Sequence, residues 1–345
     1  MKIALIGLGM VADTHLAAIK HSQMALHLAG VMGRDRQRTA EFAAKASDMM
    51  GHRVPVFASV EEIAAEDDID FALIATPPDA RKSLVDVLTA AKTPILMEKP
   101  IERTLPAARA IVEQCAARDV PLGIVFQHRV REASRALKKV LNAEALGQIA
   151  TVEIRVPWWR DQSYYAAPGR GTYARDGGGV MINQAIHTLD LALWLLGPIR
   201  TVQAMMRTTP LHQLEAEDWT GAMFEMENGA VGTLMATTAA FPGDAESISI
   251  QGSKAAAHLA SGVLTLTHLD GRVETFGATA STGGGADPMA FTHEWHQSVI
   301  EDFAQALTTN RPPLATGASA LMAHCVIDAM ERANRSGSAT QVASA

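Results

Sequence analysis

The stretch that decides the fold is KIALIGLGMVA, residues 2–12. A short apolar run is followed at once by Gly7-x-Gly9-x-x-Ala12. The first glycine permits a tight turn, the second lets the backbone approach a ligand, and the helix that follows points free amide groups at the turn. The pattern predicts a phosphate-binding βα turn, with a glycine-rich turn that binds nothing as the alternative. Residues expected to line it are Gly7, Gly9, Met10 and Val11.

Short apolar runs alternate with helix-length segments through the first third of the chain. The runs are residues 2–7, 26–33, 70–76, 93–98 and 121–126. This rhythm is typical of βαβ units, in which the strands form a buried parallel sheet. We therefore expect an α/β fold whose N-terminal part, residues 1–123, is a Rossmann domain that binds a dinucleotide.

Beyond residue 123 the pattern changes. Strand-like segments with turn signals between them predict a large open sheet, mixed or antiparallel, in an α+β domain at residues 124–345. The segments are helices at 132–143, 180–196, 291–308 and 318–334, strands at 149–157, 219–226, 230–238 and 247–251, and a flexible loop at 281–286.

Composition narrows the class of protein. The 345 residues carry a formal net charge of -7, which argues against nucleic-acid or anionic membrane partners and favours a small-molecule substrate. The two cysteines lie far apart, so we expect neither a disulfide framework nor a zinc site. No run of 18 apolar residues occurs, and the start of the chain reads as a strand rather than a signal segment. These features predict a cytoplasmic protein without a metal.

The end of the second strand bears on cofactor choice. An acidic residue for the ribose is expected there, and Gly33 stands in its place with Arg34 next to it. Arg34, with Arg38 in reserve, suits a 2′-phosphate, so the sequence favours NADP over NAD. In the alternative, the arginines are a solvated helix start and Asp35 binds the ribose.

Two further segments fall at the carboxyl edge of the predicted sheet, where ligands bind in such folds. Thr76 and Pro77 follow one strand, and Glu98 and Lys99 follow the next. A lysine held there is a candidate for proton transfer at the cofactor, because partial burial lowers the pKa of an amine. The alternative is a surface lysine that pairs with Glu98.

The apolar helix at 180–196 follows Asp176-Gly177-Gly178-Gly179 and carries a single polar stripe. At about 100° per residue, Asn183, His187 and Asp190 share one narrow arc. Such a cluster is a natural acid/base site. On its own, such a cluster is more often a core histidine bonded to Asp190, and the combination with the cofactor turn and Lys99 favours the acid/base site instead. By contrast, His293-Glu294-Trp295-His296 has the wrong spacing for a metalloprotease motif and reads as a solvated helix start.

A loop at residues 157–173 gathers aromatic and arginine side chains. Aromatic faces stack on sugar rings and arginines hold carboxylates or phosphates, so this loop is a candidate substrate surface. An interface with another domain or subunit is the alternative. The predicted substrate set is Lys99, Gln127, Trp158, Trp159, Arg160, Tyr164, Arg170, Asn183 and His187.

In this order the glycine turn, Thr76-Pro77-Pro78, Glu98-Lys99-Pro100 and the Gly-rich helix resemble the Gfo/Idh/MocA oxidoreductases. The resemblance implies dimers or tetramers formed through the C-terminal sheet, and a catalytic set of Lys99 and His187. The chain departs from the pattern where Asn183 replaces the usual aspartate, so we expect His187 to be a weaker proton relay and Lys99 to carry more. Arg81 also stands where many relatives have histidine.

The expected function is hydride transfer between NADP or NAD and a hydroxyl-bearing carbon of a sugar, cyclitol or nucleotide-linked sugar derivative. Two alternatives belong to other classes. One is a glycosidase that uses bound NAD transiently, and the other is a sensor that keeps the cofactor site without catalysis.

Overall fold

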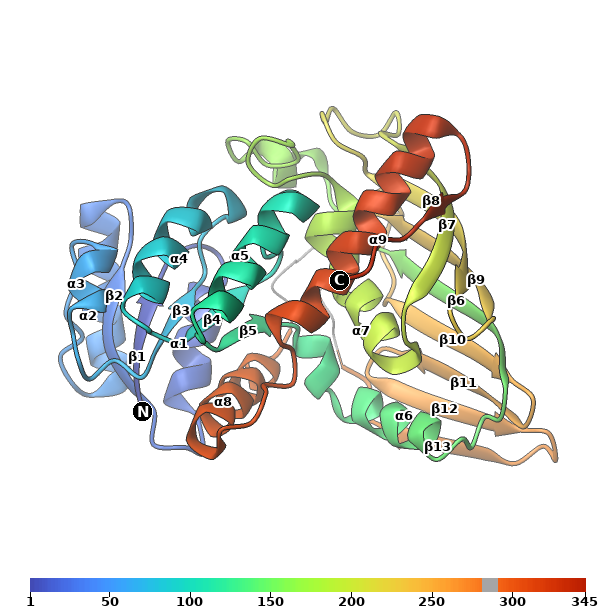
Figure 1. The fold of residues 1–345 in the computed structure, drawn as a ribbon, viewed down its shortest axis with the longest axis horizontal. Helices are drawn as coiled ribbons and strands as arrows, with labels where there is room; N and C mark the ends of the chain where they lie inside the picture. Colours follow the sequence, from blue (N-terminus) through green and yellow to red (C-terminus); the bar gives the residue numbers. More distant parts are fainter. Residues whose placement is uncertain (281–290) are drawn as a thin grey trace. The chain divides into compact units, whose positions relative to one another are not determined.

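The computed structural model describes residues 1–280 and 291–345, and the expected loop at 281–286 falls outside them. The chain forms two compact units (Figure 1). The first unit comprises residues 1–102, 106–127 and 292–320, and the second comprises residues 103–105, 128–291 and 321–345. Unlike the expected division at residue 123, this arrangement returns a late segment of the chain to the first unit.

The first unit is built on a parallel sheet with the order β2-β1-β3-β4-β5, in agreement with the predicted α/β fold. Its strands are buried because helices cover them, which explains the nearly continuous apolar runs. The strands are β1 (Lys2–Ile6), β2 (His27–Met32), β3 (Phe71–Ile74), β4 (Ile95–Glu98) and β5 (Leu122–Val125). The helices are α1 (Ala12–Lys20), α2 (Arg36–Met50), α3 (Val60–Ala64), α4 (Arg81–Ala90), α5 (Leu105–Ala117) and α8 (Glu294–Thr309).

Helix α8 joins the first unit through an apolar contact that local sequence does not reveal. Phe303 is buried and meets Phe71 edge to face, with ring centroids 5.2 Å apart. It also lies over Gly123, where an added Cβ would come within 2.6 Å of the Phe303 ring. Glycine in β5 therefore makes room for a helix that arrives from residues 294–309.

The second unit is a mixed sheet with the order β13-β12-β11-β10-β6-β9-β8-β7-β14, in which β6 and β9 run parallel and the other pairs are antiparallel. Helices α6 (Glu132–Asn142) and α7 (Ile186–Leu196) pack on the sheet, and α9 (Gly317–Ser336) completes the chain's helices in the described ranges. The strands are β6 (Ile149–Pro157), β7 (Ile199–Arg207), β8 (Trp219–Met226), β9 (Val231–Thr237), β10 (Ser247–Gly252), β11 (Ala255–Ala260), β12 (Val263–His268), β13 (Val273–Gly277) and β14 (Thr340–Gln341).

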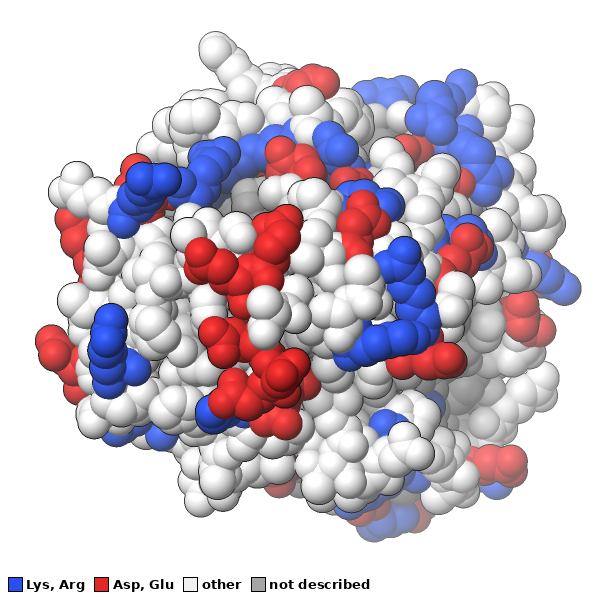
Figure 2. All heavy atoms as spheres, turned by 60° about the vertical axis from the view of Figure 1, so that its left-hand side comes forward, with Lys and Arg blue, Asp and Glu red and all other residues white. Residues whose placement is uncertain are grey.

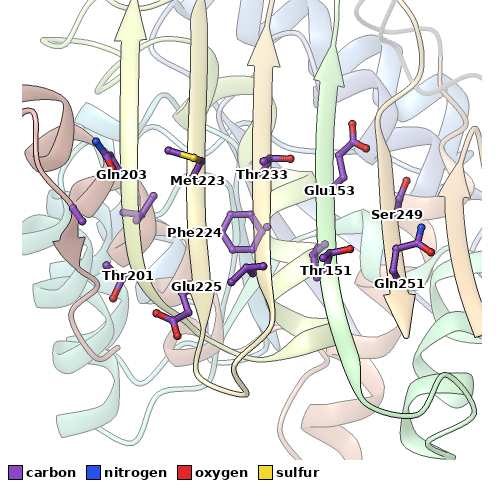
Figure 3. A pocket seen from close by; sticks show the side chains of 15 residues that line it. Thr151, Glu153, Thr201, Gln203, Met223, Phe224, Glu225, Thr233, Ser249 and Gln251 are labelled. Atoms are coloured by element: carbon purple, nitrogen blue, oxygen red, sulfur yellow. The ribbon is translucent and has the colours of Figure 1, made fainter. Parts of the chain in front are cut away.

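The two faces of this sheet differ. Along β6, Val152, Ile154 and Val156 are buried, whereas the alternate residues are exposed. The exposed side chains line a shallow hollow of about 650 Å³ (Figure 3). Its lining mixes Thr, Ser, Gln and Glu with apolar residues, of which Met223 and Val231 are 60% and 52% exposed. The predicted open sheet is thus present.

Charge on the exterior is mixed. Acidic and basic side chains lie among uncharged ones on the face drawn in Figure 2. Within the described ranges, no helix has the length and apolarity needed to cross a bilayer.

Candidate active site

The glycine turn lies where the strand order of the first sheet reverses, between β1 and β3. Gly7 has φ +98°, and a Cβ there would approach the backbone nitrogen of Thr76 to 2.6 Å. Nothing lies within 4 Å of the position that a Cβ on Gly9 would take. The turn is thus closed against β3 on one side and open to a ligand on the other, as a pyrophosphate site requires.

Neighbouring groups fit the same ligand. Helix α1 begins at Ala12 without a side-chain cap, so its first amide groups are available to phosphate oxygens. Met10 is exposed beside the turn, and Val11 is half-buried. The buried hydroxyl of Thr76 has no partner among the described residues, and neither has the amide oxygen of Gln127, which follows β5. The residues present therefore suit a dinucleotide bound at this edge.

The end of β2 has no space for an acidic side chain. A Cβ on Gly33 would lie 2.4 Å from the Thr39 hydroxyl oxygen. Asp35 caps α2, accepting a hydrogen bond from the Arg38 amide at 2.9 Å. One oxygen of its carboxylate is thereby bound to the helix start, and the side chains of Arg34 and Arg38 are exposed beside it.

Glu98, next to Lys99, is the centre of a buried polar cluster. His15 Nε2 lies 2.9 Å and His296 Nε2 3.6 Å from Glu98 Oε1, and the Lys99 amide donates to Oε2 at 3.2 Å. Burial alone would raise the pKa of Glu98, but the hydrogen bond from His15 and the charges of His15, His296 and Lys99 lower it to about 2. Glu98 is therefore a fixed anion beneath the candidate lysine.

These three side chains could also be considered as metal ligands, since their ligand atoms lie within 4.8 Å of one another. Two ligands of a tetrahedral zinc ion stand about 3.3 Å apart, at bond lengths of about 2.0–2.1 Å. The 2.9 Å between His15 and Glu98 is a hydrogen-bond distance. We assign the cluster to hydrogen bonding and ion pairing.

The cluster corrects one prediction. His296 is 2% exposed, so this residue of the expected solvated helix start is buried, whereas Glu294 is exposed. The reason is that α8 packs against α1, which places His296 edge to face with His15 at 5.2 Å. Periodicity within one segment carries no information about such a partner.

Arg81 ties the carboxyl edge together, a role that the sequence left open. Its guanidinium donates to the backbone oxygens of Thr76, Glu98 and Pro100. Burial lowers the pKa of Arg81 to about 10, which still leaves it protonated at neutral pH. Arg81 therefore braces the segments that follow β3 and β4, Pro77 included.

In the second unit, Asn183 and Asp190 of the predicted polar stripe bind different partners. Residues Met181–Ala185 form a π-helical turn before α7, so a constant 100° per residue does not hold across the segment. Asn183 Nδ2 donates to the Gly178 and Gly179 carbonyls at 2.8 and 3.1 Å. Asp190 is bound by Arg129 at 2.6 and 2.8 Å through its two oxygens, which makes it a buried structural ion pair.

His187 is buried in α7 and stacks on His128, with ring centroids 5.0 Å apart and planes 24° from parallel. His128 Nε2 in turn lies 3.8 Å from Glu246 Oε1, which Arg131 binds at 2.6 Å. The stacking fixes the plane of the His187 ring. A neutral imidazole held in this way can accept a proton from a hydroxyl group.

The aromatic loop packs on itself. The Arg160 guanidinium, which is buried, lies over the rings of Trp158 and Tyr164 at 5.3 and 5.5 Å. Arg170 lies over Tyr164 at 4.4 Å, and Trp159 meets Phe241 edge to face at 5.4 Å. These contacts pack the side chains of the loop against one another and against Phe241.

The loop also contacts the polar helix segment. Gln184 Nε2 and the Tyr164 hydroxyl are 3.4 Å apart, so the loop and the turn that carries Asn183 share one region of the second unit. Sequence reasoning missed the residues that brace the candidate residues. These are His15, which bonds to Glu98; Arg129, which binds Asp190; and Glu217, whose carboxylate accepts the Gly179 and Met181 amides.

Comparison with known proteins shows which family the chain resembles. Residues 1–126 match the family described as "Oxidoreductase family, NAD-binding Rossmann fold", and residues 134–258 match the "GFO/IDH/MocA C-terminal domain". D-apiose dehydrogenase of Rhizobium rhizogenes is 26% identical over 95% of this chain and 94% of its own length.

Solved structures with a similar fold agree with this family match. The WlbA dehydrogenase of Bordetella pertussis, in complex with NADH and UDP-GlcNAcA, is 26% identical with a TM-score of 0.81 over 99% of both chains. Levoglucosan dehydrogenase in complex with NADH and levoglucosan shares the fold, with a TM-score of 0.86 at 20% identity over 100% of both chains. Together, the ordered motifs, the two-unit fold and these matches show that the chain belongs to the Gfo/Idh/MocA family of oxidoreductases.

Proposed function

We propose that this oxidoreductase transfers hydride between a nicotinamide dinucleotide and a hydroxyl-bearing carbon of a sugar, a cyclitol or a nucleotide-linked sugar derivative. The observation that carries the proposal is the open glycine turn beside Thr76 at the strand-order reversal, with Lys99 at the end of β4 in the same sheet. The substrate class is supported by relatives that include D-apiose dehydrogenase and an inositol 2-dehydrogenase of Rhizobium meliloti.

The chain's own residues supply binding and proton transfer. When bound, a nicotinamide would exchange hydride with the reacting carbon. We assign Gly7, Gly9, Met10 and Val11 to the phosphates. Thr76, Pro77 and Glu98 belong to the same cofactor edge. Lys99 and His187 are assigned to the proton of the reacting hydroxyl, and Asn183 to a hydrogen bond with substrate.

Different neighbouring groups hold Lys99 and His187 in place. Glu98 stays ionised at neutral pH and accepts the Lys99 backbone amide, so the lysine extends from a fixed point. His187 is oriented by the stacked ring of His128. Asn183 donates an amide hydrogen but supplies no negative charge to stabilise an imidazolium, so we assign the larger share of proton transfer to Lys99.

For the cofactor we propose NADP in preference to NAD. A carboxylate at residue 33 would repel a 2′-phosphate, and the Thr39 contact keeps any side chain out of that place. Asp35 caps α2 through one carboxylate oxygen, and we assign the phosphate to Arg34, with Arg38 nearby. Arg34→Ala should raise the KM for NADP at least tenfold and change the KM for NAD little.

Substrate recognition is assigned to Gln127 and to the aromatic loop residues Trp158, Trp159, Arg160, Tyr164 and Arg170. Gln127 offers a buried amide oxygen without a partner among the described residues. Tyr164 offers an aromatic ring, and its partner Arg170 is half-exposed.

We also propose a homodimer or homotetramer formed through the open sheet face (Figure 3). We further propose a cytoplasmic location, in keeping with the two buried thiols.

The test is absorbance of reduced nicotinamide while the purified protein receives NAD or NADP with sugars, sugar acids, cyclitols and nucleotide sugars. Reduction with one compound establishes the activity and the cofactor. Lys99→Ala and His187→Ala variants, shown to be folded by circular dichroism, should each lose at least a hundredfold in kcat. Full turnover in both variants would refute the assignment. Release of free sugar without net reduction would instead indicate a glycosidase, and cofactor binding with no turnover a sensor.

A further inference from the structure

Glu217 holds the start of the helix that carries Asn183 and His187, although it is distant in sequence. Its Oε2 accepts the Gly179 amide at 3.0 Å and its Oε1 the Met181 amide at 3.1 Å. Its backbone oxygen accepts the Val180 amide between them at 2.8 Å. One residue therefore binds three successive amide groups.

The contact is tight enough to require glycine. A Cβ on Gly179 would lie 1.7 Å from the Glu217 backbone oxygen, so no other residue fits there without moving one of the two segments. Glu217 lies two residues before β8, whose pairing with β7 and β9 anchors it in the sheet. The helix start is thus held against the sheet rather than by its own side chains.

No side chain of the helix itself caps these amide groups in place of Glu217. Val180, the residue before the π-helical turn, provides no side-chain cap, and the Asn183 amide bonds back to the Gly178 and Gly179 carbonyls. The path of residues 178–181 therefore determines where Asn183 lies, and through the following turn it determines the direction of His187.

Among the described residues, no basic side chain balances the charge of Glu217. It is 6% exposed, and both carboxylate oxygens bind backbone amides. The groups that face it are Tyr173 from the preceding loop and Glu331 from α9, and Arg335 on the same helix lies 3.7 Å from Glu331. Burial, reinforced by the charge of Glu331, outweighs the amide hydrogen bonds and raises the pKa of Glu217 to about 7.

We propose that Glu217 is a positioning residue for the reaction, fixing the turn at residues 178–181 so that Asn183 and His187 face the substrate. This inference rests on the proposed function, since it assumes that the helix serves catalysis. It predicts that loss of the clamp slows turnover without weakening cofactor binding, because the glycine turn belongs to the first unit.

The first experiment compares the kinetics of Glu217→Ala, Glu217→Gln and Glu331→Gln with the wild type on the substrate found above. Glu217→Ala should lower kcat at least tenfold and leave the KM for the cofactor within about twofold, since displacement of a catalytic group by about 1 Å costs up to a hundredfold. Glu217→Gln keeps the shape and one acceptor, as the protonated acid does, so it should recover most of the loss and remains informative if the alanine variant fails to fold. Glu331→Gln, which removes a neighbour that binds no amide of the turn, should keep the wild-type kcat.

The second experiment measures amide hydrogen exchange of residues 176–185 at pH 6 and pH 8, corrected for the intrinsic rate. Opening exposes Glu217 and returns its pKa to the ordinary value, so protonation favours the closed state. Opening in the wild type should therefore be about tenfold rarer at pH 6 than at pH 8. In Glu217→Gln the two values should agree within about twofold, and Glu331→Gln should move the wild-type transition to lower pH.

The outcomes separate the two proposals. Faster exchange in Glu217→Ala together with a lower kcat supports the positioning role. Faster exchange with an unchanged kcat overturns it. If His187→Ala keeps full turnover, the use of this helix in the proposed function falls and the positioning role with it. Full turnover in the Glu217 variants alone leaves the proposed function intact.

Discussion

Glu98→Gln is the perturbation whose size the structure defines best. The carboxyl has an ordinary pKa of 4.5 and a pKa of about 2 in the folded protein. A depressed pKa contributes stability above the ordinary value and loses it as the pH falls through the folded value. At 1.36 kcal/mol for each unit of pKa, the ionised Glu98 stabilises the first unit by about 3 kcal/mol above pH 5 and by about 1 kcal/mol at pH 3.

Glutamine resembles the protonated acid, so the variant should unfold more easily than the wild type by those two amounts. The assay is urea unfolding at pH 7 and pH 3, followed by fluorine NMR of 5-fluorotryptophan. Trp295 is the one tryptophan of the first unit among the described residues, and its signal therefore reports that unit alone. Glu113→Gln, at an exposed position of α5, is the matched control and should change stability by less than about 0.5 kcal/mol. An equal loss at both pH values would refute the ion-pair reasoning.

Three further predictions address other contacts. Arg129→Ala leaves Asp190 buried without its partner and should cost about 3–5 kcal/mol in urea unfolding, whereas a loss below about 1 kcal/mol would contradict the assignment of a buried ion pair. Gly33→Ala should cost about 1–3 kcal/mol through its contact with the Thr39 hydroxyl, and Thr39→Ala in the same chain should recover most of that loss if the contact is the cause. Burial raises the pKa of Cys115 to about 11, so its alkylation at pH 8 should be at least about a hundredfold slower than that of a free thiol, as peptide mass spectrometry can measure.

The parts of the fold that sequence predicts well are those fixed by local pattern. The alternation of apolar runs gave the five parallel strands of the first sheet, and Gly7 with Ala12 gave the turn at its edge. The sequence predicts the helix at residues 180–196, but not its π-helical beginning. A wide turn there depends on the grip of Glu217 on Gly179 and Met181, and those contacts span 36 to 38 positions of the chain.

The candidate site shows the same limit. Lys99 and His187 stand out by motif, whereas the groups that support them do not. The spacing of residues 293–296 predicts a solvated helix start, yet His296 shares the buried face of α8 with Val299, Ile300 and Phe303. The packing of α8 on α1 then buries it against His15. Arg81 begins a helix like many surface arginines, yet it binds three backbone oxygens that only the sheet brings together. Such partners are set by tertiary contact, which spacing along one segment does not encode.

Two buried glutamates show how much those partners decide. Glu98 is surrounded by two histidines and a lysine, so its pKa falls to about 2, whereas Glu217 has only amide hydrogen bonds and an acidic neighbour, so its pKa rises to about 7. Glu98, which supports Lys99, therefore stays ionised throughout the neutral range. Glu217, which supports the helix that carries His187, changes its charge state within that range. If Glu98 and Glu217 support the reaction as proposed, only Glu217, of these two, can make turnover depend on pH in the neutral range. Glu217→Gln should therefore remove this contribution to the pH dependence, whereas Glu98→Gln should leave it in place.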